Sequence, residues 1–312
     1  MFLHYALLFT MVALAVSITA GGLVQSKSRG VTSQTERLFE IGRKDLKKLK
    51  NLYSPDGKKS YVTYVTISNY IRWFEQNPKL TNVKFYSLNG NFSDGTFVVT
   101  DGYAVTADTL NESYDRLYRL LLLFDFSKSY VFIGVRNELK PTVNRALDEL
   151  NVKITEDSPD LLYYLAKEEA LKFDVKVPEG IELRPINEPH DIKKVISVYP
   201  HPRQSFPDYL QQLAKYNPNV GAFTTDGALV AWIFRYPSGL LGILQADQKY
   251  KGKGYAALVT KCLSKKVAEM GHDVYSAIIE DNKPSRSLFT KLGFKPIARI
   301  HWIDTEKHIV SS

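Results

Sequence analysis

Apolar residues recur along this chain in two spacings, at alternate positions in some runs and at every third or fourth position in others. The first spacing predicts half-buried strands and the second predicts amphipathic helices. The two kinds of run follow one another along the whole chain. That alternation is typical of an α/β or α+β protein built in layers.

The first part of the chain predicts an N-terminal α/β domain over residues 31–176. We expect its strands at 83–88, 96–100 and 130–135. We expect its helices at 32–50, 68–76, 114–122, 141–150 and 161–173. The segment Val177-Pro178-Glu179-Gly180 predicts the linker that ends this domain.

Beyond the linker, residues 181–306 predict a second domain. We expect its strands at 181–185, 220–224, 228–234, 239–246, 274–279 and 295–303. We expect its helices at 188–198, 206–216, 255–270 and 285–292. Asp226-Gly227 indicates a hairpin turn between two of the strands, and Gly271 is well placed to end the longest helix. No internal repeat is evident in the sequence.

Residues 1–24 form an apolar leader. Nearly every residue from Phe2 to Ala20 is apolar, and the basic Lys27 and Arg29 follow. Three interpretations stay open: a signal peptide, a membrane anchor close to the ~20 residues that a span needs, or an upstream start codon that is not used. The leader is therefore left out of the prediction of the fold.

Charge and cysteine content narrow the classes of function. The chain has 312 residues and a formal net charge of +8, so it could attract nucleic acid, an anionic membrane or an acidic ligand. Its densest basic run, 43–50, has helical spacing and indicates a solvated helix face, so we expect no nucleic-acid partner. Cys262 is the one cysteine, which excludes an internal disulfide and a multi-cysteine metal site. We expect a buried thiol there, and no metal.

The segment Lys251-Gly252-Lys253-Gly254-Tyr255-Ala256 connects an expected strand to an expected helix. A helix start leaves amide N–H groups unpaired and carries partial positive charge. The two glycines would let an anion approach closely, and the two lysines add full charges. The segment therefore predicts a pyrophosphate site, although a tight connection without a ligand is the alternative. It matches neither the P-loop nor the dinucleotide-binding glycine pattern.

A second motif follows the strand expected at 274–279. It runs from Asn282 to Leu292-Gly293-Phe294. Together with Lys251, Gly254 and Ala256 it resembles the acyl-CoA motifs of the GNAT superfamily, the Gcn5-related N-acyltransferases. Over residues 181–303 the chain is most similar to the glycine N-acyltransferase-like or FR47-like group.

The resemblance implies a GNAT-like mixed twisted sheet flanked by helices, with a second, smaller N-terminal α/β domain. It implies acyl-CoA as cosubstrate and a small amine, such as glycine or another amino acid, as acceptor. A mitochondrial or cytoplasmic location is implied too, with a membrane or secretory route only if the leader is functional. The residues implied to hold acyl-CoA are Leu244, Gln245, Ala246, Lys251, Gly252, Lys253, Gly254, Tyr255, Ala256 and Asn282.

The chain departs from the family where acid–base chemistry is expected. Lys249 stands at the position of the glutamate base, and Phe289 stands at the position of the tyrosine that protonates the thiolate. Asp247 is the nearest carboxylate and our candidate base, with Glu280 and Asp281 as others, and Ser285 is a candidate hydroxyl. Two functions remain open: an N-acyltransferase, or an acyl-CoA-binding module without catalysis. A basic protein that binds nucleic acid or a membrane surface ranks last.

Overall fold

The computed structural model describes residues 35–53, 61–201 and 204–306. The apolar leader, 1–24, lies outside the described residues. Within the described ranges no helix is both long enough and apolar enough to cross a membrane.

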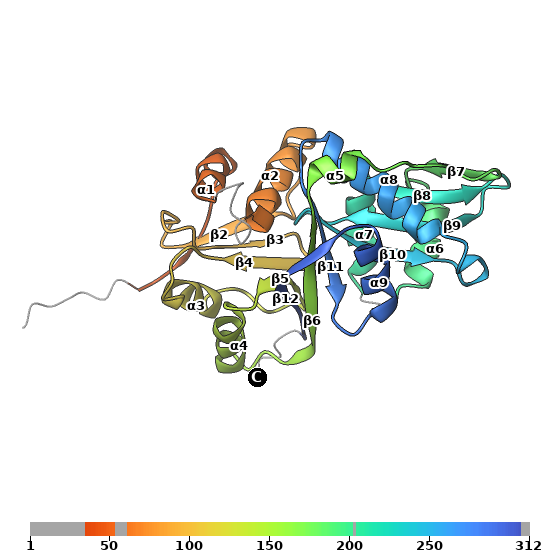
Figure 1. The fold of residues 1–312 in the computed structure, drawn as a ribbon. Helices are drawn as coiled ribbons and strands as arrows, with labels where there is room; N and C mark the ends of the chain where they lie inside the picture. Colours follow the sequence, from red (N-terminus) through yellow and green to blue (C-terminus); the bar gives the residue numbers. More distant parts are fainter. Residues whose placement is uncertain (1–34, 54–60, 202–203, 307–312) are drawn as a thin grey trace, which may run out of the picture. The chain divides into compact units, whose positions relative to one another are not determined.

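Twelve strands form one mixed sheet in the order β1-β2-β3-β4-β5-β12-β6-β11-β10-β9-β8-β7. Figure 1 shows the strands of the first half on one side, those of the second half on the other, and β6 and β12 between them. The strands are β1 (Leu38–Glu40), β2 (Lys84–Leu88), β3 (Phe97–Thr100), β4 (Ala104–Asp108), β5 (Val131–Arg136), β6 (Ile154–Leu165), β7 (Ile181–Arg184), β8 (Asn219–Thr224), β9 (Leu229–Arg235), β10 (Leu240–Ala246), β11 (Val274–Ile279) and β12 (Lys295–Thr305).

Helices connect these strands in the same pattern in both halves. The first half has α1 (Leu46–Leu52), α2 (Tyr61–Gln76), α3 (Asp115–Leu122), α4 (Lys140–Glu149) and the short α5 (Lys167–Leu171). The second half has α6 (Pro189–Ser197), α7 (Phe206–Tyr216), α8 (Tyr255–Glu269) and α9 (Lys283–Lys291). Two 3-10 turns, η1 (Arg43–Asp45) and η2 (Gln248–Tyr250), complete the described elements.

The two halves repeat one order of elements and exchange their last strands. Each half has a strand, two helices, a three-stranded meander, a helix, a parallel strand, another helix and a last strand. Among the described pairs, β4·β5 and β10·β11 are parallel and the other pairs are antiparallel. The first half's last strand, β6, pairs with β11, and the second half's last strand, β12, pairs with β5. Each half therefore completes the sheet of the other.

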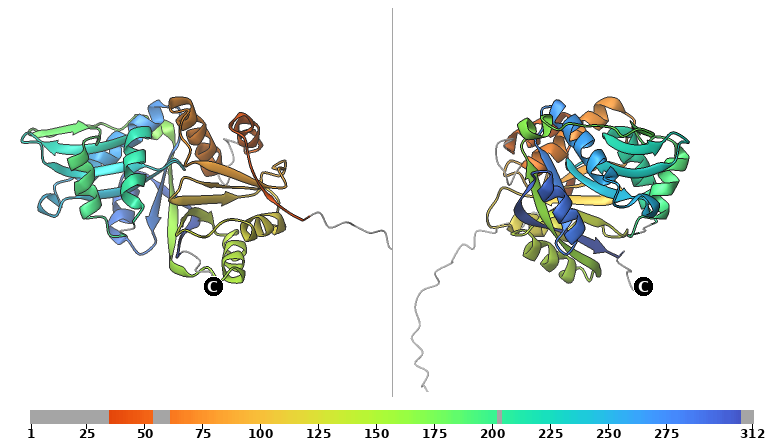
Figure 2. Two further views of the ribbon diagram at one scale, coloured as in Figure 1. Left: turned by 180° about the vertical axis from the view of Figure 1, so that it is seen from behind. Right: turned by 45° about the vertical axis from the view of Figure 1, so that its right-hand side comes forward.

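Helices cover both faces of the sheet because its strands are apolar on both faces. In β9, Val230 and Ile233 pack in the cluster that contains α8, while Trp232 and Phe234 pack in the cluster that contains α6 and α7. Figure 2 shows α6 and α7 in front of the sheet when the molecule is seen from behind, on the face opposite α8. Continuous apolar runs of this kind are typical of strands buried on both sides.

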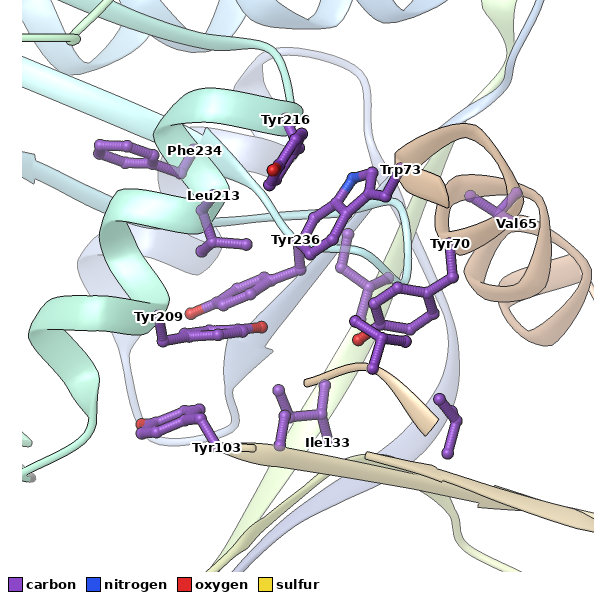
Figure 3. Packing of buried hydrophobic residues seen from close by; sticks show 14 of the residues in the cluster. Val65, Tyr70, Trp73, Tyr103, Ile133, Tyr209, Leu213, Tyr216, Phe234 and Tyr236 are labelled. Atoms are coloured by element: carbon purple, nitrogen blue, oxygen red, sulfur yellow. The ribbon is translucent and has the colours of Figure 1, made fainter. Parts of the chain in front are cut away.

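One hydrophobic cluster joins the two halves. Trp73 of α2 lies against Tyr216 of α7, with ring centroids 4.9 Å apart (Figure 3). Tyr103, which follows β3, stacks on Tyr209 of α7 at 4.5 Å. The described residues from Glu36 onward form one compact unit. Whether the predicted domains 31–176 and 181–306 fold by themselves stays a prediction.

The expected elements of the second half are confirmed to within a few residues, but the first half contains four differences. The helix expected at 68–76 begins seven residues earlier, at Tyr61. The helix predicted at 161–173 is wrong: Leu161–Leu165 ends the long strand β6, and only α5 is helical. The helix predicted at 32–50 is divided at Gly42 into β1, a 3-10 turn and α1. Strand β4 was not predicted. A short apolar run fits either a strand or a buried helix, and long-range pairing decides between them.

Candidate active site

Strands β10 and β11 separate at their carboxyl ends. Their parallel pairing is confined to Leu240↔Tyr275 and Leu241↔Ser276. Beyond Ser276 the described pairing of β11 continues only with β6, on its other edge. Backbone groups of both strands therefore face a gap. In open α/β sheets, ligands bind at such a divergence, outside the carboxyl ends of the strands.

A β-bulge in β10 lies at the point where β10 separates from β11. The register with β9 shifts between Gly242 and Gln245, so two residues of β10 oppose one residue of β9. Ile243, inside the bulge, has a φ of 54°, which is a strained conformation for a β-branched residue. Gly242 has no room for a side chain, because a Cβ atom there would lie 2.3 Å from the Tyr236 ring. Strain of this kind is concentrated at functional sites, which supports a role for the gap.

The glycine turn lies directly after β10. Gly252 and Gly254 have φ angles of 78° and 83°, the left-handed region that glycine adopts without strain. A Cβ atom at either position would meet no other atom within 4 Å, so the space beside the turn is open. Gly254 is the N-cap of the fifteen-residue helix α8, whose first amides have no intrahelical partner. Lys251 and Lys253 are exposed beside them.

A cavity of about 270 Å³ lies in the gap between β10 and β11. It brings together four of the predicted residues, namely Leu244, Gln245, Asn282 and Ser285. Ala246 does not line this cavity and pairs with Ala231 of β9. The predicted residues of the turn, 251–256, do not line it either. The residues expected to hold acyl-CoA thus form two groups. Leu244, Gln245 and Asn282 line the cavity, and residues 251–256 form the turn that follows β10 and η2.

The cavity also contains a carboxyl group that the sequence did not indicate. Asp160 of β6 lines it and is only 5% exposed. Burial raises the pKa of Asp160 to about 7. The Ser158 hydroxyl donates a hydrogen bond to the Asp160 carboxylate at 3.1 Å, which lowers this pKa by a smaller amount. Asp160 reaches the cavity because β6 pairs with both β11 and β12, with Ile279 and Ile300 as its neighbours. A carboxyl with a pKa near neutrality is suited to acid–base catalysis.

Asp247, the base expected from the sequence, has a different environment. Its carboxylate accepts a hydrogen bond from Lys194 Nζ at 2.6 Å and one from the Lys249 amide at 3.0 Å. These two bonds, that from Lys194 first, hold the pKa of Asp247 below its ordinary value. Asp247 does not line the β10/β11 cavity. A carboxylate paired in this way is a poor proton acceptor at neutral pH.

Two other predicted positions lie at the start of α9. The Asn282 side chain accepts a hydrogen bond from the Ser285 amide at 3.1 Å and so caps the helix. Ser285 lies one turn inside the helix and lines the cavity with Phe289. Phe289 is buried against Tyr163 and Phe294. Glu280 forms an ion pair with Arg299, and Asp281 is exposed.

Comparisons with known proteins show which fold the chain has. The family model described as FR47-like protein matches residues 219–303. A Drosophila protein of a structural genomics project superposes with a TM-score of 0.78 at 21% identity, over 87% of this chain and 99% of that one. A tandem GNAT protein from the clavulanic acid biosynthesis pathway gives a TM-score of 0.56 at 14% identity, over 89% and 100%. The chain has the GNAT fold.

A third structure spans more than this chain. It is the GCN5-related glucosamine N-acetyltransferase region of a fungal multi-domain GH3 β-N-acetylglucosaminidase, with a TM-score of 0.53 at 13% identity. The match covers 88% of this chain and 38% of that one. No curated protein sequence matches the chain significantly.

The corresponding place in the first half has a smaller cavity, of about 130 Å³, where β4 and β5 separate after pairing at two positions. There β4 and β5 take the places of β10 and β11, and an ion pair bridges their carboxyl ends: Arg136 donates to the Asp108 carboxylate at 2.7 Å. Arg136 also donates to the carbonyl oxygen of Thr109, at 2.9 Å. The segment that follows β4, 109–114, contains no glycine. Of the two halves, the second therefore has the features that suit an acyl-CoA ligand.

Proposed function

We propose that this protein is an N-acyltransferase that moves an acyl group from acyl-CoA to the amine of a small molecule. The observation that carries the proposal is the gap between β11 and β10, the strand that leads to the glycine turn, because this gap holds a cavity lined by Asp160. The GNAT fold and the FR47-like match over 219–303 support it. In the first half the cavity is smaller, an ion pair lies at the strand ends and no glycine turn follows β4, so we assign the reaction to the second half.

In this proposal the successive parts of acyl-CoA lie along β10 and the turn that follows it. The pyrophosphate lies at the amides and lysines of the turn 251–254, because helix starts and glycine turns bind anions. The pantetheine arm lies along Leu244 and Gln245, where the bulge leaves strand backbone facing the gap. The thioester then enters the cavity between β10 and β11.

In the reaction, the acceptor ammonium first gives a proton to the ionised carboxylate of Asp160. The neutral nitrogen attacks the thioester carbonyl and the C–N bond forms. As the C–S bond breaks, the nitrogen loses its second proton to solvent, which leaves a neutral amide and a CoA thiolate that is then protonated to the thiol. A pKa of about 7 leaves a large fraction of Asp160 ionised at neutral pH and still basic enough to accept the proton. Ser285 remains our candidate for protonating the thiolate, because it lines the same cavity.

A catalytically inactive acyl-CoA-binding module is the second candidate function. Lys249 is exposed and Phe289 is buried, so neither supplies the acid–base group that the resemblance implies at its position. The two candidates share the turn and the cavity but differ in whether Asp160 acts on an amine. The expectation that the acceptor is glycine or another amino acid stays a prediction in either case.

The test uses two matched glycines. Gly254 and Gly227 both have φ above 80°, and a Cβ atom at either would meet nothing within 4 Å, but Gly227 lies in the β8–β9 hairpin. Alanine at either position costs roughly 1–2 kcal/mol of backbone strain. We expect only Gly254→Ala to raise the Kd for acetyl-CoA, by at least tenfold, measured by calorimetry.

Thiol release from acetyl-CoA or benzoyl-CoA in the presence of amines separates the two functions. Turnover supports the acyltransferase, and tight acyl-CoA binding without turnover supports the binding module. If neither acyl-CoA binds, or if Gly227→Ala weakens binding as much as Gly254→Ala, the proposal is wrong.

The location of the protein also stays a prediction. The resemblance favours mitochondria or cytoplasm, while the leader 1–24 would direct the chain to a membrane or the secretory route if it is functional. A fluorescent fusion of the first 30 residues, compared with one that lacks them, measures which of the two occurs.

A further inference from the structure

The walls of the β10/β11 cavity include several aromatic side chains. Tyr103, Tyr199, Tyr236 and Trp302 line it. The rings of Tyr236 and Trp302 have centroids 5.1 Å apart, and Tyr199 stacks on Phe206 at 3.9 Å. Aromatic ring faces attract cations, and sets of such rings bind ammonium groups. The cavity thus suits a positively charged acceptor.

Among the described residues that line the same cavity, several are acidic. Its carboxyl groups come from Glu156, Asp160 and Asp304, and no lysine or arginine is found among its described lining residues. His201 also lines it and lies 3.4 Å from the Glu156 carboxylate. An acceptor that carries a carboxylate, such as an amino acid, would enter this cavity beside like charges. Like charges brought together act as selection against such a ligand.

A second cavity, of about 790 Å³, continues from the first. It shares Tyr103, Glu156, His201 and Asp304 with the first cavity. It adds the carboxylates of Asp208 and Glu306 and one lysine, Lys128, among its described lining residues. Glu306 is paired with Lys153 at 3.2 Å, whereas Asp208 adds an exposed carboxylate beside Glu156 and Asp304. The path from the surface to Asp160 therefore runs through an acidic outer cavity into an aromatic inner one.

We propose that the acceptor is a di- or polyamine without a carboxylate. One terminal ammonium enters the aromatic inner cavity and reaches Asp160, while a second ammonium lies among the carboxylates of the outer cavity. This inference rests on the proposed acyltransferase function and adds the chemical class of its acceptor. The aromatic inner cavity suits one ammonium and the acidic outer cavity suits a second, which neither the acidic residues nor the aromatic rings would indicate alone.

The experiment compares acceptors that differ in one charge. With acetyl-CoA held constant, thiol release is measured for 1,4-diaminobutane, spermidine, n-butylamine and glycine. We expect a KM for the diamine at least tenfold below that for n-butylamine, which has the same carbon chain without the second ammonium. We expect glycine to be the poorest of the four. Glycine or n-butylamine used as well as the diamines would overturn the inference and leave the acyltransferase proposal intact.

Calorimetric binding of spermidine in the presence of CoA tests the inference without turnover. We expect binding that weakens as salt is added, because the outer cavity is exposed to solvent. Absence of spermidine binding would overturn the inference whatever the enzyme assay gives. If spermidine binds but no acceptor is turned over, the acceptor class stands and the proposed reaction fails.

Variants locate the second ammonium. Asp208 is exposed and lines the outer cavity but not the inner one, so Asp208→Asn should fold normally. We expect it to raise the KM for the diamine roughly fivefold, as for an exposed ion pair, with the KM for n-butylamine unchanged. Glu179→Gln, at an exposed carboxylate in the linker, is the matched control. An equal effect on both amines would overturn the assignment of the outer cavity.

Discussion

Replacement of Asp160 by asparagine removes a buried ionisable group and keeps its shape. The pKa of this carboxyl is raised from 3.8 to about 7, chiefly by burial. The folded protein therefore binds the proton more tightly than the unfolded chain does, and ionisation of the group destabilises the native state. The penalty is absent below about pH 4, grows as the pH rises, and is complete above about pH 7.

The magnitude follows from the difference between the two pKa values. About 3 units correspond to about 4 kcal/mol of lost stability at high pH. Between about pH 5 and about pH 8 the penalty grows by about 2.5 kcal/mol. Asparagine does not titrate, so the free energy of unfolding of the variant does not include this pH-dependent penalty. We expect Asp160→Asn to gain about 2.5 kcal/mol in free energy of unfolding relative to wild type between these two pH values.

Urea unfolding of both proteins at the two pH values measures this difference. The activity of the same variant tests the chemical role. We expect kcat/KM of the wild type to rise with pH to an inflection near 7. Asp160→Asn should lose that inflection and about 10² to 10⁴ in rate, as for loss of a general base.

Asp174→Asn is the control, because Asp174 is exposed and paired with Lys176 at 2.9 Å. It should change neither the pH dependence of stability nor the rate. A wild-type rate and inflection in Asp160→Asn would refute the role of Asp160 in the reaction. A stability difference that does not change with pH would refute the raised pKa itself.

Further predictions concern the ion pair of the first half and three residues predicted from the sequence. Arg136→Ala leaves the buried Asp108 without its partner, so we expect a loss of about 3–5 kcal/mol in urea unfolding; a loss below 1 kcal/mol would contradict the bridge. Asp247→Asn should keep kcat within about threefold in the thiol-release assay, because its carboxylate is already paired. Ser285→Ala should lower kcat more than it changes the Kd for acetyl-CoA, and equal effects would argue against a role in chemistry. Lys251→Ala should raise the Kd for acetyl-CoA about fivefold at low salt and less at high salt, since this lysine is exposed.

Local sequence patterns determined most of the second half. The helix at 255–269, its glycine start and the strand before it are found within one or two residues of the prediction. Asp226-Gly227 forms the expected turn, with the Gly227 amide bonded to the Thr224 carbonyl. These features depend on residues adjacent in the chain: glycine permits positive φ, and helical spacing buries one face. A short motif can therefore indicate them without knowledge of the rest of the fold.

Only the tertiary structure placed Asp160. It follows Ser158-Pro159, a pair typical of loops, and precedes an apolar run that fits a helix as well as a strand. It lies in a strand because β11 and β12, more than a hundred residues later in the chain, supply hydrogen-bond partners on both edges of β6. The same strand exchange brings a residue of the first half into the cavity of the second.

The separation of β10 from β11 was decided in the same way. A glycine within a strand, such as Gly242, is compatible with a bulge, but the sequence does not show that Ile243 adopts a φ of 54°. The Tyr236 ring occupies the space beside Gly242, and the surrounding core holds the strained segment in place. The sequence by itself thus determined the turn that suits the pyrophosphate, because that depends on local backbone freedom. The tertiary structure decided the cavity and its carboxyl group, because both depend on which distant strands lie side by side.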